Sequence, residues 1–409
     1  MVRATGEVGI RGTISSPFHV GVLQKDRIMA IPSLLGRTAA ALRVGGVLLL
    51  GVAPEAAAQA GSRGDPRFVL TPLLTIGGDA AAGAYTFNRV SDVAAGPDGT
   101  IYVLDAGDQM VKAYTAAGRF VRRFGRRGMG PGEFTHPVGL RVDSVVTVFD
   151  AAQNRFSAFS LAGEHRRTRR LPTSGGVALA TRYPLRDGFA VGMTAAHHSL
   201  GSPANDPYHT VLLIAPDGRL ADTLLVYHSG ATVWHPVNAT IPWGIAASDF
   251  GPAGAWAVTG DSLVAVVDGY GGVVRWLAVA GGRTRQLRAA RLPNPARAIT
   301  QADLAAVEQT LRAESPDRLG RVALEPPPRW SAATRALFGD DGALWIQNGN
   351  GPDESRIWTV FDREGRFLRR LQLPAGFLLR SIRGDRLYGV AKTDLDVDMV
   401  RVFRLQEQR

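Results

Sequence analysis

The sequence predicts an all-β fold: a six-bladed β-propeller of four-stranded antiparallel blades. Three observations predict it, namely the composition, a strand-and-turn unit that recurs along the chain, and an extra strand near the start that can close a ring. The 409 residues include 48 glycines and 24 prolines, and 45% of them are hydrophobic. This composition suits a large core built from many short strands joined by tight turns.

The recurring unit is clearest between Asp92 and Phe134. Its β-rich runs are separated by the turns Pro97-Asp98-Gly99 and Ala117-Gly118, and Asp-Gly between alternating apolar runs is a strong hairpin signal. The unit is therefore a meander of strands A, B, C and D. First turns recur with aspartate at Asp98, Asp143, Asp187, Asp261, Asp341 and Asp385. Second turns recur with glycine at Gly118, Gly163, Gly218, Gly282 and Gly365.

The sequence has six first turns but only five second turns, which indicates that the last unit lacks its fourth strand. The chain ends just after the third strand of the last unit, at about residues 399–405, so the fourth strand of that blade must come from elsewhere. The β-rich segment 68–76 precedes the first unit, and Pro72 confines it to an edge position. We expect this segment to complete the last blade and close the ring, which removes exposed sheet edges.

Particular residues resemble the NHL-repeat family. The segment Phe124–Phe134, FGRRGMGPGEF, is followed by His136-Pro137 and resembles the family's signature between blades. Residues 102–105 (YVLD) and 148–150 (VFD) are similar to the ends of its second strands. Blades one and two match well, blade five partly, and the others only in their turns. The resemblance implies a six-bladed propeller and no particular activity.

The first 60 residues read as a leader. Arg37 and Arg43 precede the apolar run 44–52, and Ala58-Gln59-Ala60 gives an A-x-A cleavage pattern. The run is too short to span a bilayer. We therefore expect a leader and signal peptide over 1–60, within which 1–28 fit an over-extended gene start because Met29 begins a leader of ordinary length. The propeller occupies 61–409, exported to the periplasm or secreted, without a transmembrane segment.

The charge is basic, with 47 Lys and Arg against 36 Asp and Glu, and the chain has no cysteine. Disulfides, thiol nucleophiles and Cys-ligated metals are therefore excluded. Almost all basic residues are arginines, and they form no run of five like charges. We read them as scattered, which does not favour nucleic acid as a partner, and we expect a monomer.

Turn spacing locates the longest loops. The interval from Asp187 to Gly218, which contains the B–C loop of blade three, is about eleven residues longer than in blades one and two. The D–A connections from blade three to four and from four to five are longer by about 18 and 34 residues. Both loop types leave the same face of a propeller, so these insertions crown one side of one face, where recognition sites concentrate.

The longest insertion contains a predicted helix. Thr300 to Asp303 resembles a capping box, and Ser315-Pro316 marks the end. Leu304, Val307 and Leu311 form an apolar stripe that we expect to pack over the ring as a lid or brace.

The expected ligand-binding residues lie in or beside these insertions. Imidazole is the commonest metal ligand and general base, and exposed indole rings can bind glycans or peptides. The candidates are His197, His198, His209, His228, Trp234, His235 and Trp243. No HExxH spacing or Ser-His-Asp order is present, so the catalytic residues stay unknown.

Metal candidates are His198 and His235, together with Asp394 and Asp396 in the last B–C loop. The segment KTDLDVDM resembles the start of a calcium loop, but Met399 and Leu405 replace the required glycine and glutamate. A divalent metal, zinc or calcium, is therefore an open cofactor prediction. Asp105, Asp150 and Asp268 end second strands in three blades, and this repetition favours a structural role in the following turns.

These observations favour a binding module that recognises a peptide, glycan or protein through the loop-rich face of blades three to five. The alternative is a metal-assisted lyase or hydrolase with its site at the channel mouth, because amidating lyases and lactonases share the propeller fold. A scaffold or sensor domain is a third hypothesis, although no further domain remains once six blades are assigned. The substrate cannot be read from the sequence.

Overall fold

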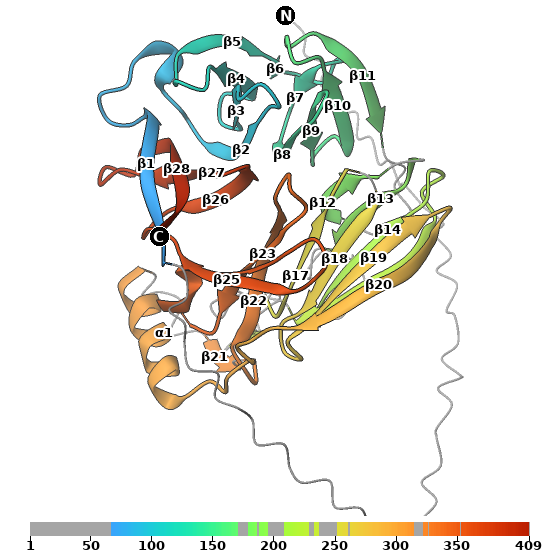
Figure 1. The fold of residues 1–409 in the computed structure, drawn as a ribbon, viewed down its shortest axis with the longest axis vertical. Coiled ribbons are helices and arrows are strands. Elements are labelled where there is room, and N and C mark those ends of the chain that lie inside the picture. The colour runs from blue at the N-terminus through green and yellow to red at the C-terminus, as the bar shows by residue number, and fades with distance from the viewer. Residues whose placement is uncertain are drawn as a thin grey trace, which may run out of the picture. The chain divides into compact units, whose positions relative to one another are not determined.

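The computed structural model describes residues 67–170, 179–185, 188–194, 208–228, 233–236, 252–260, 262–314, 322–325, 327–351 and 353–408. These residues form six four-stranded antiparallel sheets arranged as the blades of a propeller (Figure 1), which confirms the predicted fold class. The predicted ligand residues His197, His198 and Trp243 lie outside the described residues. The predicted leader over residues 1–60 lies outside them as well.

In each blade, strands A to D follow one another from the centre of the ring outward. Blade one contains β2 (Val90–Ala95), β3 (Ile101–Asp105), β4 (Met110–Tyr114) and β5 (Phe120–Phe124). Blade two contains β8 (Pro137–Val142), β9 (Val146–Asp150), β10 (Arg155–Phe159) and β11 (His165–Arg170). Blade three contains β12 (Leu179–Pro184), β13 (Ala190–Thr194), β14 (Tyr208–Ile214) and β15 (Leu220–His228).

The second half of the ring repeats this order. Blade four contains β17 (Gly254–Val258), β18 (Leu263–Asp268), β19 (Val273–Ala280) and β20 (Arg283–Arg291). Blade five contains β22 (Ser331–Phe338), β23 (Leu344–Gly349), β24 (Ile357–Phe361) and β25 (Phe367–Gln372). Blade six contains β26 (Leu378–Arg383), β27 (Arg386–Lys392), β28 (Asp398–Gln408) and β1 (Arg67–Gly77).

The turns between strands A and B follow the predicted chemistry. Asp98 Oδ1 accepts the Thr100 N–H at 3.0 Å, and Asp341 Oδ1 accepts the Ala343 N–H at 2.9 Å. Gly99 follows with φ 80°, which a residue with a side chain rarely adopts. The local sequence thus determines the geometry of these hairpins without help from contacts between blades.

The ring closes as predicted. Strand β1 pairs antiparallel with β28, from Arg67 opposite Gln408 to Gly77 opposite Met399, so a strand from the start of the propeller completes the last blade. The register shifts between Pro72 and Leu74. Proline lacks an N–H, and the outer edge of a blade is the place where a strand tolerates it.

The core lies between neighbouring blades. Tyr102 and Phe124 of blade one pack with Phe159 of blade two, and Trp276 of blade four packs with Phe361 of blade five. Most of these aromatic pairs meet edge to face, as Trp276 and Phe361 do at a centroid distance of 5.8 Å. Because each blade buries its faces against the next, the ring is rigid where loops must be held in place.

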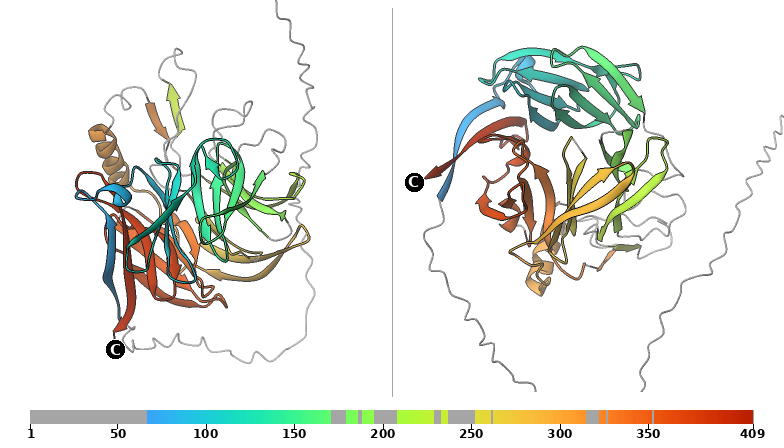
Figure 2. Two further views of the ribbon diagram at one scale, coloured as in Figure 1. Left: turned by 90° about the horizontal axis from the view of Figure 1, so that it is seen from above. Right: turned by 45° about the vertical axis from the view of Figure 1, so that its right-hand side comes forward.

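B–C loops and D–A connections emerge on one face, which we call the loop face. Strand β16 (Val233–Pro236) of the three-to-four connection pairs with β21 (Val322–Glu325) of the four-to-five connection, so the two longest insertions join each other. Figure 2 shows this pair and α1 (Gln301–Glu314) on the same side of the ring. Shorter elements are β6 (Arg126–Arg127), β7 (Glu133–Phe134), η1 (Gly83–Tyr85) and η3 (Asp353–Arg356).

Helix α1 begins and ends where the sequence predicts. Asp303 N–H donates to Thr300 Oγ1 at 3.2 Å, and Thr300 N–H donates to Asp303 Oδ2 at 2.8 Å, which is a reciprocal capping box. Arg297 forms an ion pair with Asp303 and donates to the Asn350 carbonyl of blade five at 2.7 Å. The start of the helix is therefore fastened to the ring. No helix among the described residues is long and apolar enough to cross a bilayer.

Candidate functional site

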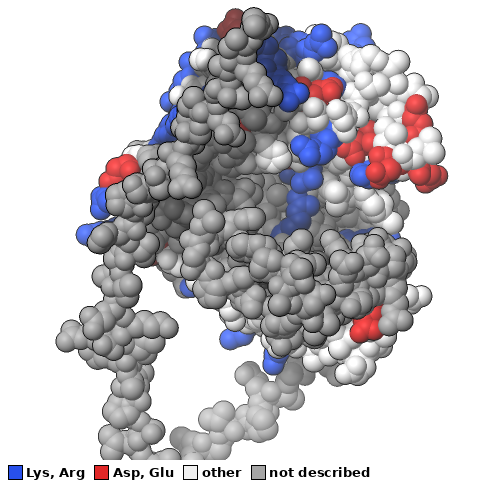
Figure 3. All heavy atoms as spheres, turned by 180° about the vertical axis from the view of Figure 1, so that it is seen from behind, with Lys and Arg blue, Asp and Glu red and all other residues white. Residues whose placement is uncertain are grey.

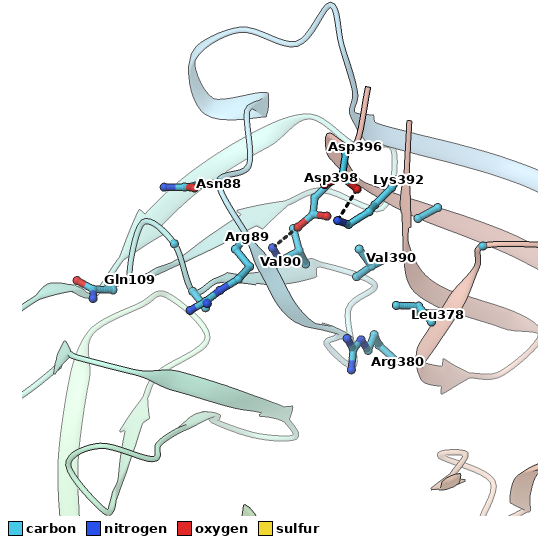
Figure 4. Close-up of a pocket in the computed structure, with 14 residues that line it drawn as sticks. Asn88, Arg89, Val90, Gln109, Leu378, Arg380, Val390, Lys392, Asp396 and Asp398 are labelled. Carbon is cyan, nitrogen blue, oxygen red and sulfur yellow. Dashed lines mark hydrogen bonds and ion pairs between the residues drawn. The ribbon is translucent and has the colours of Figure 1, made fainter. Parts of the chain in front are cut away.

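A pocket of about 840 Å³ opens between blades six and one (Figure 4). Its walls come from the ends of strands and from loops of the loop face: two D–A connections and two B–C loops. The lining residues are Asn88, Arg89, Val90, Ala106, Gly107, Gln109, Gly376, Leu378, Arg380, Val390, Ala391, Lys392, Asp396 and Asp398. The pocket thus lies on the predicted face, but away from the predicted side of blades three to five.

A buried ion pair holds the blade-one wall of the pocket. Lys112 Nζ lies 2.9 Å from both Asp105 Oδ2 and Asp108 Oδ2 and donates to the Thr86 carbonyl at 2.7 Å. Asp105 Oδ1 accepts the Arg89 N–H at 3.1 Å and Asp105 Oδ2 accepts the Asn88 N–H at 3.2 Å. The segment that carries Arg89 is therefore tied to the end of strand β3.

The charge state of Asp105 follows from this network. Burial would raise the pKa of its carboxyl group, but the Lys112 ammonium and the backbone N–H groups of Arg89 and Asn88 outweigh burial and hold the pKa below its ordinary value. Asp105 is thus a carboxylate with its acceptor sites occupied.

The repeated aspartates do the same in other blades, as predicted. Asp150 Oδ2 accepts the Thr135 N–H at 2.6 Å and Asp150 Oδ1 accepts the Gln153 N–H at 2.9 Å. Asp268 Oδ1 accepts the N–H groups of Tyr270 and Gly271, both at 3.0 Å. Asp105, Asp150 and Asp268 are therefore structural residues that shape the B–C loops.

The carboxylates in the blade-six wall are also engaged. Asp398 Oδ2 accepts the Val90 N–H at 2.7 Å, which joins positions 308 residues apart in the sequence. Asp396 Oδ1 lies 2.6 Å from Lys392 Nζ. Figure 4 shows these two contacts side by side on one wall. Asp396 is thus ion-paired with Lys392, while Asp398 is hydrogen-bonded to the backbone of blade one and keeps its charge.

Two guanidinium groups of the pocket lack such partners. Arg89 precedes β2 and Arg380 lies in β26, and neither side chain has a hydrogen-bond or ion-pair partner among the described residues. The Nε atom of Arg380 is buried as well. Figure 4 shows both side chains extending away from the Lys392–Asp396 pair. Guanidinium forks match carboxylate and phosphate oxygens in pairs, so the arrangement is suited to an anionic group.

Arg380 also borders the central channel, which the innermost strands line. Burial, and then repulsion from Arg380, lower the pKa of Arg335 to about 10, and Arg335 donates to the Leu379 carbonyl at 3.1 Å. Burial raises the pKa of Asp92, although the Arg380 charge opposes this shift. The Asp92 carboxyl oxygens accept the Val93 and Leu140 N–H groups. Figure 3 shows basic side chains along the hollow of the ring.

Tyr183 of blade three completes the polar group in the channel. Its ring meets Trp256 of blade four edge to face at 5.3 Å. Tyr183 is 37% exposed to solvent in the channel. Burial among the surrounding strands, and then the Asp92 charge, nevertheless raise the pKa of its hydroxyl group to about 12. Tyr183 is therefore a neutral hydrogen-bond donor in a channel where Arg335 and Arg380 outnumber Asp92.

Two of the predicted histidines, His209 and His228, have described side chains, and both lie at the loop face of blade three. The His209 ring lies 5.4 Å from the Tyr227 ring, and the His228 ring lies 5.4 Å from Tyr208 and 6.2 Å from Tyr270 of blade four. Burial and then the neighbouring His209 lower the pKa of His228. The two imidazoles are thus neighbours within an aromatic cluster.

The remaining predicted residues are placed only in part. Trp234 and His235 lie in β16 opposite Leu324 and Ala323 of β21, and their side chains are outside the described part. Of the metal candidates, Asp396 is paired with Lys392, and Asp394 is not among the residues that line the pocket. Within the described ranges, no three His, Asp or Glu side chains are grouped to hold a metal ion.

Sequence reasoning missed Arg89 and Arg380. Loop lengths directed attention to blades three to five, whereas the connections around this pocket have ordinary lengths. One signal was available, because Arg380 is a charged residue inside a short strand that the repeat places at the centre of the ring. A charge at such a position needs a partner or a function.

Comparison with known proteins agrees with the fold. Residues 86–185 match a family model described as a 6-bladed beta-propeller. No curated protein matches the sequence. The description of this family model names the six-bladed propeller and not the NHL repeat, so the NHL-repeat resemblance stays a prediction.

Solved structures similar to the chain have propeller folds and share little sequence. A candidate exported protein of Bacteroides fragilis is 12% identical, with a TM-score of 0.46, 84% of this chain and 95% of that chain covered. A catalytically inactive virginiamycin B lyase of Staphylococcus aureus, solved with quinupristin, is 10% identical, with a TM-score of 0.37 and coverages of 83% and 100%. The PQQ-bound aldose sugar dehydrogenase of Streptomyces coelicolor is 13% identical, with a TM-score of 0.39 and coverages of 84% and 100%.

Proposed function

We propose that this propeller is a recognition module that binds its ligand on the loop face, and that the ligand presents an acidic group to Arg89 and Arg380. The observation that carries the proposal is this pair of arginines, which share one pocket and make no hydrogen bond or ion pair with an acidic side chain among the described residues. Arg89 is exposed, whereas Arg380 is half-buried and its Nε atom is buried without a hydrogen-bond partner. An unpaired charge at the Arg380 position is costly, so a ligand that supplies the counter-charge is favoured there.

The pocket also fits the remainder of such a ligand. Its volume of about 840 Å³ lies within the usual range for small-molecule sites, about 300–1,000 Å³. Val90, Leu378 and Val390 offer apolar contact, while Asn88 and Gln109 offer amide groups. The end of an acidic peptide or an acidic sugar of a glycan matches this combination. The insertions of blades three to five lie on the same face, where a longer ligand can reach them.

Binding to a panel of acidic and neutral peptides and glycans tests this proposal. We expect the protein to select acidic members, and the variant Arg89→Gln/Arg380→Gln to bind them at least about tenfold more weakly, because charge-assisted pairs contribute about 1.5–3 kcal/mol each. The variant Arg291→Gln/Arg370→Gln, which removes two exposed arginines from outer strands, is the matched control and should bind normally.

Three outcomes would contradict the proposal. Equal affinity in the pocket variant and the control would move the site elsewhere on the loop face. Turnover of a panel member that stops after chelation would favour the alternative, a metal-assisted lyase or hydrolase. Neutral ligands bound as well as acidic ones would remove the role of the arginines.

Export is part of the proposed function, because the A-x-A pattern at residues 58–60 follows a short apolar run. We expect the protein in the periplasm or the medium to begin at Gly61. Mass spectrometry of protein recovered from those fractions measures this directly, and a retained residue 1–60 segment would contradict it.

A further inference from the structure

The outermost strands of four blades carry arginine and no acidic residue. Strands β5 and β25 contain two arginines each, and β11 and β20 contain four each, whereas none of the four contains aspartate or glutamate. In the sequence these arginines read as scattered, but the fold gathers them on the outer edges of the blades. The interpretation of the arginines as scattered is therefore incomplete.

The concentration is highest where blades one and two adjoin. We call this surface the arginine rim, and it consists of Arg122, Arg123, Arg126, Arg127, Arg166, Arg167, Arg169 and Arg170. All of these side chains are exposed except that of Arg169, which is half-buried. Arg122 Nη1 donates to the Ala162 carbonyl of blade two at 2.8 Å, so the two outer strands belong to one surface.

The rim retains a net positive charge after its ion pairs are counted. Arg126 binds Glu133 and Arg166 binds Glu164, each at 2.7 Å. Arg122 and Arg169 each donate to a backbone carbonyl, which leaves their charge in place. Four further side chains have no hydrogen-bond or ion-pair partner in the described part of the chain: Arg123, Arg127, Arg167 and Arg170.

Protection of the edges explains only part of this pattern. Charged side chains on an outer strand prevent pairing with another chain, but either sign of charge serves that purpose. A mixture of acidic and basic side chains would protect the edges as well, and it would destabilise the folded chain less because neighbouring charges would repel one another less. Six arginines without a carboxylate partner on adjoining blades therefore indicate an anionic partner.

We propose that the arginine rim binds an acidic polysaccharide, a flexible chain with carboxylate or sulfate groups at regular intervals. Alternate side chains of a strand lie about 6.8 Å apart, which gives a row of guanidinium forks for successive acidic groups. Single-stranded nucleic acid usually also needs exposed rings on which bases stack. The described rings beside the rim are poorly placed for such stacking, because Phe124 and Phe134 are buried and the exposed His165 ring already meets Phe159 edge to face at 5.5 Å.

Fluorescently labelled heparin fragments and polygalacturonate serve as probes of this site. The rim variant is Arg123→Gln/Arg167→Gln/Arg170→Gln, and the matched control is Arg283→Gln/Arg285→Gln/Arg291→Gln on β20, which removes the same charge from another blade. We expect the rim variant to lower affinity at least about tenfold and to reduce the salt dependence, as a log–log slope, by about two. The control should change affinity less than about threefold at an unchanged melting temperature.

Equal losses in both triple variants would show attraction to total charge and would overturn the rim as a site, as would the absence of binding to either probe. Tighter binding to single-stranded or duplex DNA of equal charge would assign the rim to nucleic acid instead. The pocket variant Arg89→Gln/Arg380→Gln should bind both probes with at least half of the wild-type affinity, so failure at one site is distinguishable from failure at the other.

Discussion

Deletion of residues 61–77 should prevent the propeller from forming a stable ring. Strand β1 supplies the fully buried Ile76 and the half-buried Phe68, Leu70 and Leu74 to two core clusters. Loss of one buried side chain of this size costs about 2–5 kcal/mol, and the deletion also leaves β28 as an unpaired edge. The combined loss is comparable to the whole stability of a typical domain, about 5–15 kcal/mol.

Thermal unfolding and analytical ultracentrifugation measure this result. A synthetic peptide of residues 67–77 should restore a folded monomer when it is added to the deletion variant, whereas a peptide of the same composition in scrambled order should not. A deletion variant that unfolds at the wild-type temperature as a monomer would show that β1 does not hold the ring closed.

Replacing Asp105 by alanine should lower the free energy of unfolding by about 3–5 kcal/mol, because it leaves the buried Lys112 ammonium without its buried counter-charge. Both residues are almost fully buried, with exposures of 0% and 3%. Asp108→Ala is the control, since this carboxylate also contacts Lys112 but has a side chain that is 37% exposed. The control should lose about 1 kcal/mol or less.

Acid titration gives the same interaction a second readout. The pKa of Asp105 is lowered in the folded protein, so its contribution to stability is complete above the ordinary value of 3.8 and is lost as the pH falls through the folded pKa. The Asp105→Ala variant should therefore lose less stability than the wild type below about pH 4. Chemical denaturation from pH 7 to pH 3 checks this, and parallel pH curves would contradict it.

Local chemistry explains which parts of the fold were predictable. The Asp98 and Asp341 turns, the capping box at Thr300 and the turn hydrogen bonds of Asp105, Asp150 and Asp268 each involve residues close in sequence or a repeated position. The ring closure by β1 followed from counting turns. The turns and the cap are confirmed because short-range rules decide them, and the closure, which pairs β1 with β28, is confirmed because the count of repeated turns left one strand missing.

The pocket and the arginine rim follow a different logic. Arg89 and Arg380 come from opposite ends of the chain and meet only because the ring closes, as the Asp398–Val90 contact between blades six and one shows. Loop length pointed to the loop face, on which the pocket also lies, but it cannot report on a site built from loops of ordinary length. Likewise, the sequence does not show that arginines of separate blades share one rim until the outer strands are placed.

The measurement that tests the central claim most directly is the structure of the protein in complex with an acidic ligand selected from the panel. The proposed recognition function predicts that the acidic group lies within about 3 Å of the guanidinium nitrogens of both Arg89 and Arg380, with the rest of the ligand against Val90 and Leu378. An acidic group bound on the side of blades three to five, with both arginines free of contact, would contradict it.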